Sequence, residues 1–125
     1  MPWPEEYLLM NSARIDIKIV KGATFFFKIG LNKADKTPVD MSGFTGKAQL
    51  RDFDRNLLAT FTVTTTASGG LYLELLPEQT KAISVVPSND RSSIGRYDAM
   101  VTDELGKKIV PVWGEVVLDL AETEE

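Results

Sequence analysis

Apolar and polar side chains alternate one by one along most of this chain. In RIDIKIV (residues 14–20) three isoleucines alternate with charged residues, and in FTGKAQLR (residues 44–51) Phe44, Ala48 and Leu50 alternate with polar ones. A period of two places the apolar side chains on one face of a β-strand and the polar side chains on the other. Each of these segments is therefore predicted to be a half-buried strand.

The same alternation, bounded by turn residues, recurs along the chain and predicts about seven strands. The predicted strands are residues 14–20, 24–31, 44–51, 57–66, 71–76, 95–103 and 108–120. Between the fifth and the sixth, Pro77–Ile83 starts with a proline, which suits the first position of a helix and predicts one short helical turn. Pro111 has no N–H group, so the last strand should lie at a sheet edge or bulge at this residue.

No segment is long enough for a helix that would connect parallel strands, so antiparallel strands in two layers are expected. The sequence thus predicts an all-β fold, an immunoglobulin-like antiparallel β-sandwich, with a small β-barrel as the alternative. Residues 14–120 form the predicted sandwich domain. They lie between an N-terminal arm, residues 1–13, and an acidic C-terminal tail, residues 121–125.

The composition excludes several classes of activity. The chain has no cysteine and no histidine, so disulfides, thiolate metal sites and Ser–His or Cys–His nucleophile systems are impossible. The net charge is −4 without a basic stripe, which argues against binding to nucleic acid. No apolar run approaches the ~20 residues that span a membrane, and the first residues lack the pattern of a secretory signal. We therefore expect synthesis in a cytoplasm and no membrane partner.

One acidic segment has the spacing of a calcium-binding loop. Asp52, Asp54 and Asn56 follow a D-x-D-x-N pattern. Such a loop also needs glycine at its sixth position and glutamate at its twelfth, where this chain has Leu57 and Val63. The segment is therefore interpreted as a hairpin turn, in which Asp and Asn favour the backbone geometry.

Two further patterns have residue types that are typical of phosphate-binding or catalytic sites. The glycine-containing loops SGFTG and ASGG lead into strands, whereas a phosphate-binding loop leads into a helix. The pairs Asp98 with Asp103 and Glu74 with Glu78 could serve acid–base catalysis, but nothing in the sequence buries them or places them in a cleft. No catalytic, cofactor-binding or metal-binding residue is predicted, and the chain is not expected to be an enzyme.

Four large residues are out of phase with the inward side chains of their strands: Phe26, Tyr72, Met100 and Trp113. They either cover the rims of the sheets or form a surface that binds a partner or a second copy. A glycan-binding site would also need Asn, Asp or Gln clustered beside the aromatic residues, and the sequence shows no such clustering.

The N-terminal arm is more apolar than a solvated tail. Its residues Trp3, Tyr7, Leu8 and Leu9 would be unfavourable in water, so the arm is expected to pack on this domain or on a partner. Together with the four out-of-phase residues, these four complete the predicted partner interface.

The order of several segments resembles a known family. The segments are GATF (residues 22–25), TPVDMSGFTGKAQLRD (37–52), GGLYLELLPEQTKAI (69–83), GRYDAMVTDELGKK (95–108) and WGEVVL (113–118). Over roughly residues 14–120 they resemble the small immunoglobulin-like domains of bacteriophage tail and baseplate proteins, such as the N-terminal domain of upper baseplate proteins. The resemblance implies no catalytic residues.

The resemblance implies a structural component of a virion, in the tail, baseplate or neck, assembled in the host cytoplasm. Its expected partners are other virion proteins and further copies of itself. A capsid decoration protein and a receptor-binding or glycan-binding module are the alternatives.

Overall fold

The structure is a computed structural model that describes residues 13–33, 35–83 and 93–120, and these residues form eight strands and one short helix. The strands are β1 (Ala13–Arg14), β2 (Ile17–Lys21), β3 (Phe25–Gly30), β4 (Thr45–Asp52), β5 (Leu57–Thr65), β6 (Gly70–Leu75), β7 (Ser93–Thr102) and β8 (Lys108–Leu120). The helix α2 (Pro77–Lys81) lies between β6 and β7. Within the described ranges no helix has the length and apolar character needed to cross a membrane.

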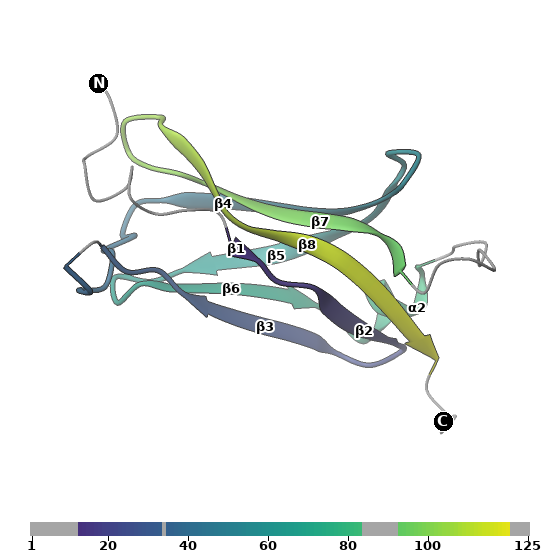
Figure 1. Ribbon diagram of the computed structural model, residues 1–125. Coiled ribbons are helices and arrows are strands. Elements are labelled where there is room, and N and C mark those ends of the chain that lie inside the picture. The colour runs from purple at the N-terminus through teal and green to yellow at the C-terminus, as the bar shows by residue number, and fades with distance from the viewer. Residues whose placement is uncertain (1–12, 34, 84–92, 121–125) are drawn as a thin grey trace.

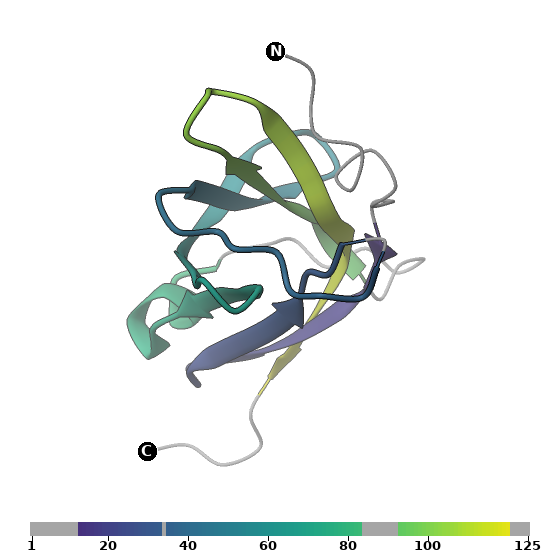
Figure 2. The same cartoon turned by 90° about the vertical axis from the view of Figure 1, so that its left-hand side faces the viewer.

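The strands form two layers that enclose the core (Figures 1 and 2). One layer contains β4, β7 and β8 together with β1 and β2, and the other contains β3 and β6. Strand β5 joins the layers, because its first half, up to Phe61, pairs with β4 and Thr62–Thr65 pairs with β6. This curled sheet is the immunoglobulin-like β-sandwich that the alternation predicts. It is not a closed barrel, since the described strands β2 and β3 are consecutive but not hydrogen-bonded to each other.

One pairing departs from the antiparallel prediction. Strands β1 and β2 both run parallel to β8, with Ala13 opposite Val112 and Ile17 opposite Val116. Alternation reports which face of a strand is buried, but not which strand lies beside it. Because β2 and β8 are separated by most of the chain, their parallel pairing needs no local crossover helix.

The first predicted strand is broken after Arg14. Ile15 lies between β1 and β2. Its N–H still donates to the carbonyl oxygen of Trp113 at 2.8 Å, while its carbonyl oxygen accepts a hydrogen bond of 2.6 Å from the hydroxyl of Tyr97. A Cβ atom on Gly114 would collide with this same carbonyl oxygen. Glycine at position 114 therefore lets the break in the first strand approach β8, and the tyrosine holds it there.

Pro111 sits at a bulge, which confirms one of the two placements predicted for it. Ala99 of β7 is opposite Val112, whereas Val101 is opposite Ile109. Two steps along β7 thus correspond to three along β8, so β8 carries one extra residue. A proline is tolerated there because a bulge leaves an N–H group out of the ladder.

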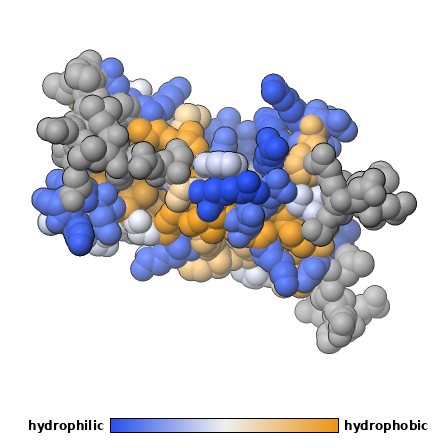
Figure 3. Space-filling model, in the orientation of Figure 1, coloured by the Kyte–Doolittle hydropathy of each residue, from blue (hydrophilic) through white to orange (hydrophobic). Residues whose placement is uncertain are grey.

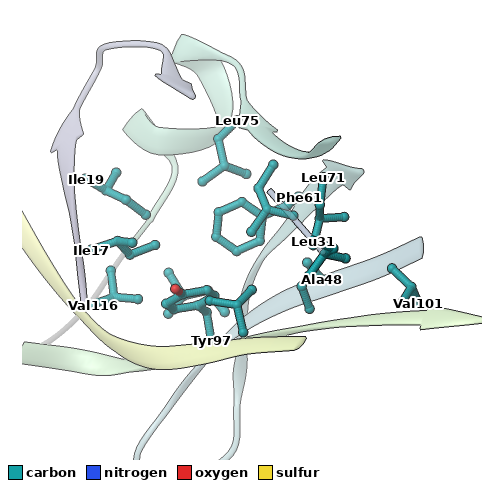
Figure 4. Packing of buried hydrophobic residues seen from close by; sticks show 14 of the residues in the cluster. Ile17, Ile19, Leu31, Ala48, Phe61, Leu71, Leu75, Tyr97, Val101 and Val116 are labelled. Carbon is teal, nitrogen blue, oxygen red and sulfur yellow. The ribbon is translucent and has the colours of Figure 1, made fainter. Parts of the chain in front are cut away.

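The core is formed by the inward side chains of both layers (Figure 4). The residues at most 1% exposed include Ile19, Leu50, Leu71, Leu73, Leu75, Ala99, Val101, Val112 and Val116. Phe61, at the point where β5 changes layers, has its ring centroid 6.2 Å from that of Tyr97 and 5.8 Å from that of Phe25. One aromatic cluster therefore connects β3, β5 and β7 at the centre of the molecule.

The short helix is anchored by one buried threonine. The Thr80 hydroxyl accepts a hydrogen bond from the backbone N–H of Gly22 and donates one to the carbonyl oxygen of Ala23. Both partners belong to the turn between β2 and β3, where Gly22 has a φ of 85° and ends the strand. The predicted helical segment, residues 77–83, begins correctly at Pro77 and ends at Lys81.

Candidate interaction surfaces

The structure divides the predicted interface residues between the two outer faces of the sandwich. Phe26 on β3 and Tyr72 on β6 lie on one layer, and Met100 on β7 and Trp113 on β8 lie on the other. These residues therefore do not form one surface. The remaining candidates, Trp3, Tyr7, Leu8 and Leu9, lie outside the described residues, as do most of the predicted arm and the tail, residues 121–125.

We call Phe26, Lys28 and Tyr72 the aromatic patch. The rings of Phe26 and Tyr72 have centroids 5.6 Å apart, and the Lys28 ammonium lies 5.5 Å from the Tyr72 ring centroid. Register explains the contact, because Lys28 is opposite Tyr72 and Phe26 is opposite Glu74. Phe26 is 59% exposed, so this patch presents a large apolar side chain to solvent without a cover.

The aromatic patch borders an unpaired strand edge. Among the described strands, β3 pairs with β6 alone and β2 pairs with β8 alone. Figure 3 shows hydrophobic residues gathered on this side of the molecule, over β3 and toward β2. The partly buried side chains include Phe27 and Ile29 of β3. An edge strand with apolar neighbours is a place where another chain can pair or pack.

Trp113 on the opposite layer is more covered. It is 37% exposed, and the Arg14 guanidinium carbon lies 5.4 Å from its ring centroid. Met100 on the same layer is half-buried. Unlike Phe26, neither residue is a bare apolar anchor.

A hollow of about 520 Å³ lies beside Trp113 on the outer face of β4, β7 and β8. We call it the arginine hollow. Its lining residues are Gln49, Arg51, Asp52, Phe53, Arg55, Arg96, Tyr97, Asp98, Val110 and Trp113. Gln49, Asp98 and Trp113 form one cross-strand row, and Arg51 and Arg96 are opposite each other in the next.

Sequence reasoning missed the arginine hollow. Arg51 and Arg96 are 45 positions apart in the chain and meet because of the β4–β7 register. The available signal was that each is an outward residue of its strand, yet alternation alone does not say which outward residues become neighbours. The same register places Gln49 and Asp98 beside Trp113, a clustering of polar groups that the sequence did not show.

The arginines of this face differ in their partners. Arg14 forms ion pairs with Asp16 at 3.1 Å and Glu115 at 3.5 Å. Arg51 instead donates to the side-chain oxygen of Gln49 at 3.1 Å and to the carbonyl oxygen of Arg55 at 3.0 Å. The Arg96 guanidinium carbon lies 5.7 Å from the Phe53 ring centroid. Within the described ranges, no ion pair involves Arg51, Arg55 or Arg96.

Asp16 links this face to the break in the first strand. Its carboxylate accepts hydrogen bonds from the Glu115 N–H group and from Arg14, and these bonds lower the pKa of Asp16 below its ordinary value. Burial raises the pKa of Tyr97 to about 12, and the negative charge of Asp16 adds to the shift. Tyr97 is therefore a neutral hydrogen-bond donor at physiological pH, which suits a structural role at the break.

The acidic segment that resembled a calcium-binding loop is a turn. Asp52 accepts hydrogen bonds from the N–H groups of Asp54 and Asn56, and these bonds hold its pKa below the ordinary value. Asp40 accepts the N–H of Ser42 in the same way. The hairpin interpretation of residues 52–56 is thus confirmed. In the part of the chain that the structure describes, no group of three or more acidic residues could hold a metal ion.

The proposed carboxylate pairs are not brought together as catalytic pairs. Asp103 accepts the N–H groups of Leu105 and Lys107, each at 2.9 Å, and closes the β7–β8 turn. Asp98 lies on β7, in the arginine hollow, five residues before Asp103. Glu74 is on β6, and Glu78 is in the first turn of α2.

Comparison with known proteins finds likeness of shape only. No protein-family model and no curated protein matches the chain. Among solved structures, the Lin-41 filamin domain aligns with 15% identity and a TM-score of 0.42, over 79% of this chain and 81% of that chain. The titin M3 domain aligns with 12% identity and a TM-score of 0.42, over 85% of this chain and 88% of that chain. Neither neighbour gives this chain a ligand or a partner.

Proposed function

We propose that this chain is a non-enzymatic structural component of a phage virion, in the tail, baseplate or neck. It acts through protein–protein contacts, including contacts with further copies of itself. The observation that carries the proposal of a contact role is the aromatic patch. Phe26 is 59% exposed beside Tyr72, on the edge strand β3, whose outer edge pairs with no described strand. The virion setting is supported by the resemblance of the ordered segments between residues 14 and 120 to phage tail and baseplate domains.

Burial of Phe26 at an interface would be favourable. At about 25 cal/mol per Å², removing an exposed aromatic side chain from water contributes on the order of 2 kcal/mol. Tyr72 and Lys28 would add a polar rim that fixes orientation, as in other interfaces where an apolar anchor is surrounded by polar groups. The free β3 edge beside the patch can also pair with a strand of the partner.

The test is the mass of the chain in solution over a range of concentrations, measured by light scattering after gel filtration. We expect the wild-type chain to self-associate and Phe26→Asp to shift it toward the monomer, because a charge replaces the apolar anchor. Leu105→Asp is the matched control, since Leu105 is 65% exposed in the β7–β8 turn, away from the patch. Circular dichroism checks that both variants keep the fold. A wild-type chain that stays monomeric at every concentration would contradict self-assembly.

The virion setting has its own test. Electron microscopy of particles that carry a labelled copy should place the label on the tail, baseplate or neck. A label found only on heads would favour a capsid decoration protein, and particles without the chain would overturn the virion role.

A further inference from the structure

The arginine hollow has more positive than negative side chains, although the whole chain has a net charge of −4. Three arginines line it against two aspartates. One of the two, Asp52, already accepts hydrogen bonds from its own turn. The hollow is thus a locally positive region on a negatively charged molecule.

The guanidinium groups of Arg51 and Arg96 are held in place, and neither forms an ion pair within the described residues. Arg51 is oriented by its bonds to Gln49 and to the carbonyl oxygen of Arg55, and Arg96 lies over Phe53. All three arginines are exposed. A planar guanidinium matches a carboxylate, with which it can form two parallel hydrogen bonds. Preordered arginines without acidic partners in the described ranges are suited to carboxylates supplied from outside.

A neutral glycan fits the arginine hollow less well. Trp113, Gln49 and Asp98 could contact a sugar ring, because an aromatic face and polar groups lie together there. That ligand would leave Arg51 and Arg96 without a countercharge. An acidic peptide uses the same guanidinium groups, and its apolar atoms can lie against Trp113.

The sequence contains such a peptide directly after β8. In residues 121–125, AETEE, three of five residues are glutamates and none is basic. In the proposed self-assembly, copies of the chain meet one another, so the glutamates of one copy can meet the arginine hollow of a second copy.

Building on the self-assembly in the proposed function, we propose that residues 121–125 of one copy bind the arginine hollow of a second copy. Glu122, Glu124 and Glu125 supply the carboxylates, and Arg51 and Arg96 are the main hydrogen-bond donors to them. The contact joins two different surfaces, so it is head-to-tail. Repetition of such a contact produces a closed ring or an open filament.

The first experiment titrates the isotope-labelled full chain with the acetylated peptide AETEE and follows backbone amide signals by NMR. We expect shifts on the outward residues of β4, β7 and β8. Arg51→Gln combined with Arg96→Gln should weaken binding at least about fivefold, since each partly exposed ion pair contributes modestly. Lys81→Gln, a loss of one positive charge on α2, is the control and should bind normally. Asp98→Asn should strengthen binding, because it removes a negative charge from the hollow.

The second experiment uses self-association of the full chain. Neutralising the tail, with Glu122→Gln, Glu124→Gln and Glu125→Gln together, should weaken association as much as the double arginine variant does. Reversing the charges tests pairing directly. One variant carries negative charges in the hollow (Arg51→Glu with Arg96→Glu), and the other carries positive charges in the tail (Glu122→Lys, Glu124→Lys and Glu125→Lys). Each variant should associate poorly alone, and a mixture of the two should recover association. Higher salt should weaken the wild-type contact.

Two results would overturn this inference. One is peptide binding that does not respond to the arginine variants. The other is glycan-array binding that is lost on Trp113→Ala while the tail variants associate normally. Both outcomes are separate from the proposed function, which depends on Phe26→Asp. If Phe26→Asp abolishes association and the charge variants do not, the proposed function stands and the tail contact is wrong.

Discussion

The two outer faces of this sandwich are built by the same alternation but carry different chemistry. The face of β3 and β6 presents Phe26, which is 59% exposed, with one lysine beside Tyr72. The face of β4, β7 and β8 presents arginines, and its tryptophan is covered by Arg14. One layer thus offers an apolar contact and the other a charged one.

The difference shows how loosely a half-buried strand constrains its outer face. Inward residues must fill a common core, so their size and polarity are set by packing. Outward residues only need to tolerate water, and they can be recruited for binding without loss of the fold. The same molecule can therefore carry two unlike contact surfaces on one core, which suits a component that meets more than one neighbour.

The largest expected effect is on stability, and it comes from comparing an inward residue of β6 with its outward neighbour. Leu73→Ala should lower the free energy of unfolding by about 3 kcal/mol, because Leu73 is fully buried and the change leaves a cavity. Its neighbour Tyr72 points outward, so Tyr72→Ala should cost about 1 kcal/mol or less and should instead weaken self-association. Urea unfolding and light scattering measure the two effects. If Tyr72→Ala destabilised the fold as much as Leu73→Ala, the aromatic patch would be structural rather than a contact surface.

The prediction of intermediate size concerns Tyr97, whose hydroxyl holds the break in the first strand. Tyr97→Phe removes the hydroxyl that donates to Ile15 and should cost about 1 kcal/mol at neutral pH. Burial raises the pKa of Tyr97 to about 12, above its value in the unfolded chain. The unfolded wild-type chain therefore loses the hydroxyl proton first as the pH rises, and the contribution of Tyr97 to stability decreases through this range.

The difference between wild type and Tyr97→Phe should accordingly be constant below about pH 10 and should shrink between about pH 10 and 12. Urea unfolding of both chains over this range measures it, and alkaline effects of other groups cancel in the comparison. A difference that stayed constant up to pH 12 would show that Tyr97 ionises equally in both states.

The smallest effect is expected at a turn that belongs to neither face. Asp40 accepts the N–H of Ser42 through a side-chain oxygen, and asparagine has an oxygen in the same place. Asp40→Asn should leave the melting temperature and self-association unchanged within experimental scatter. The variant provides a baseline for the changes on the two faces. A marked loss of association would give the TPVDMSGFTG segment a binding role in place of a structural one.

Much of the fold could be predicted because alternation is a local property. Ala48 and Leu50 were expected on the buried face of their strand and are at most 1% exposed, and Pro111 was expected at a bulge or an edge and lies at a bulge. The break after Arg14 could not be predicted, because it depends on Tyr97 and Gly114, which approach from distant parts of the chain.

The candidate surfaces were predictable only in part. The out-of-phase position of Phe26 and Tyr72 marked them as outward, and register then brought them together. Trp113 was marked in the same way, but its cover by Arg14 follows from the parallel pairing of β1 with β8. The prediction for Trp3, Tyr7, Leu8 and Leu9 concerns residues outside those described and stays a prediction.

The sequence by itself determined most of the strands, their buried faces and the turns between them, because each depends on residues a few positions apart. The order of the strands, and with it every neighbour across a face, was decided by the tertiary structure. Arg51 meets Arg96 only when β4 lies beside β7, and Tyr97 reaches Ile15 only when the first strands lie beside β8. Such contacts depend on how the whole core closes, and no local pattern encodes that.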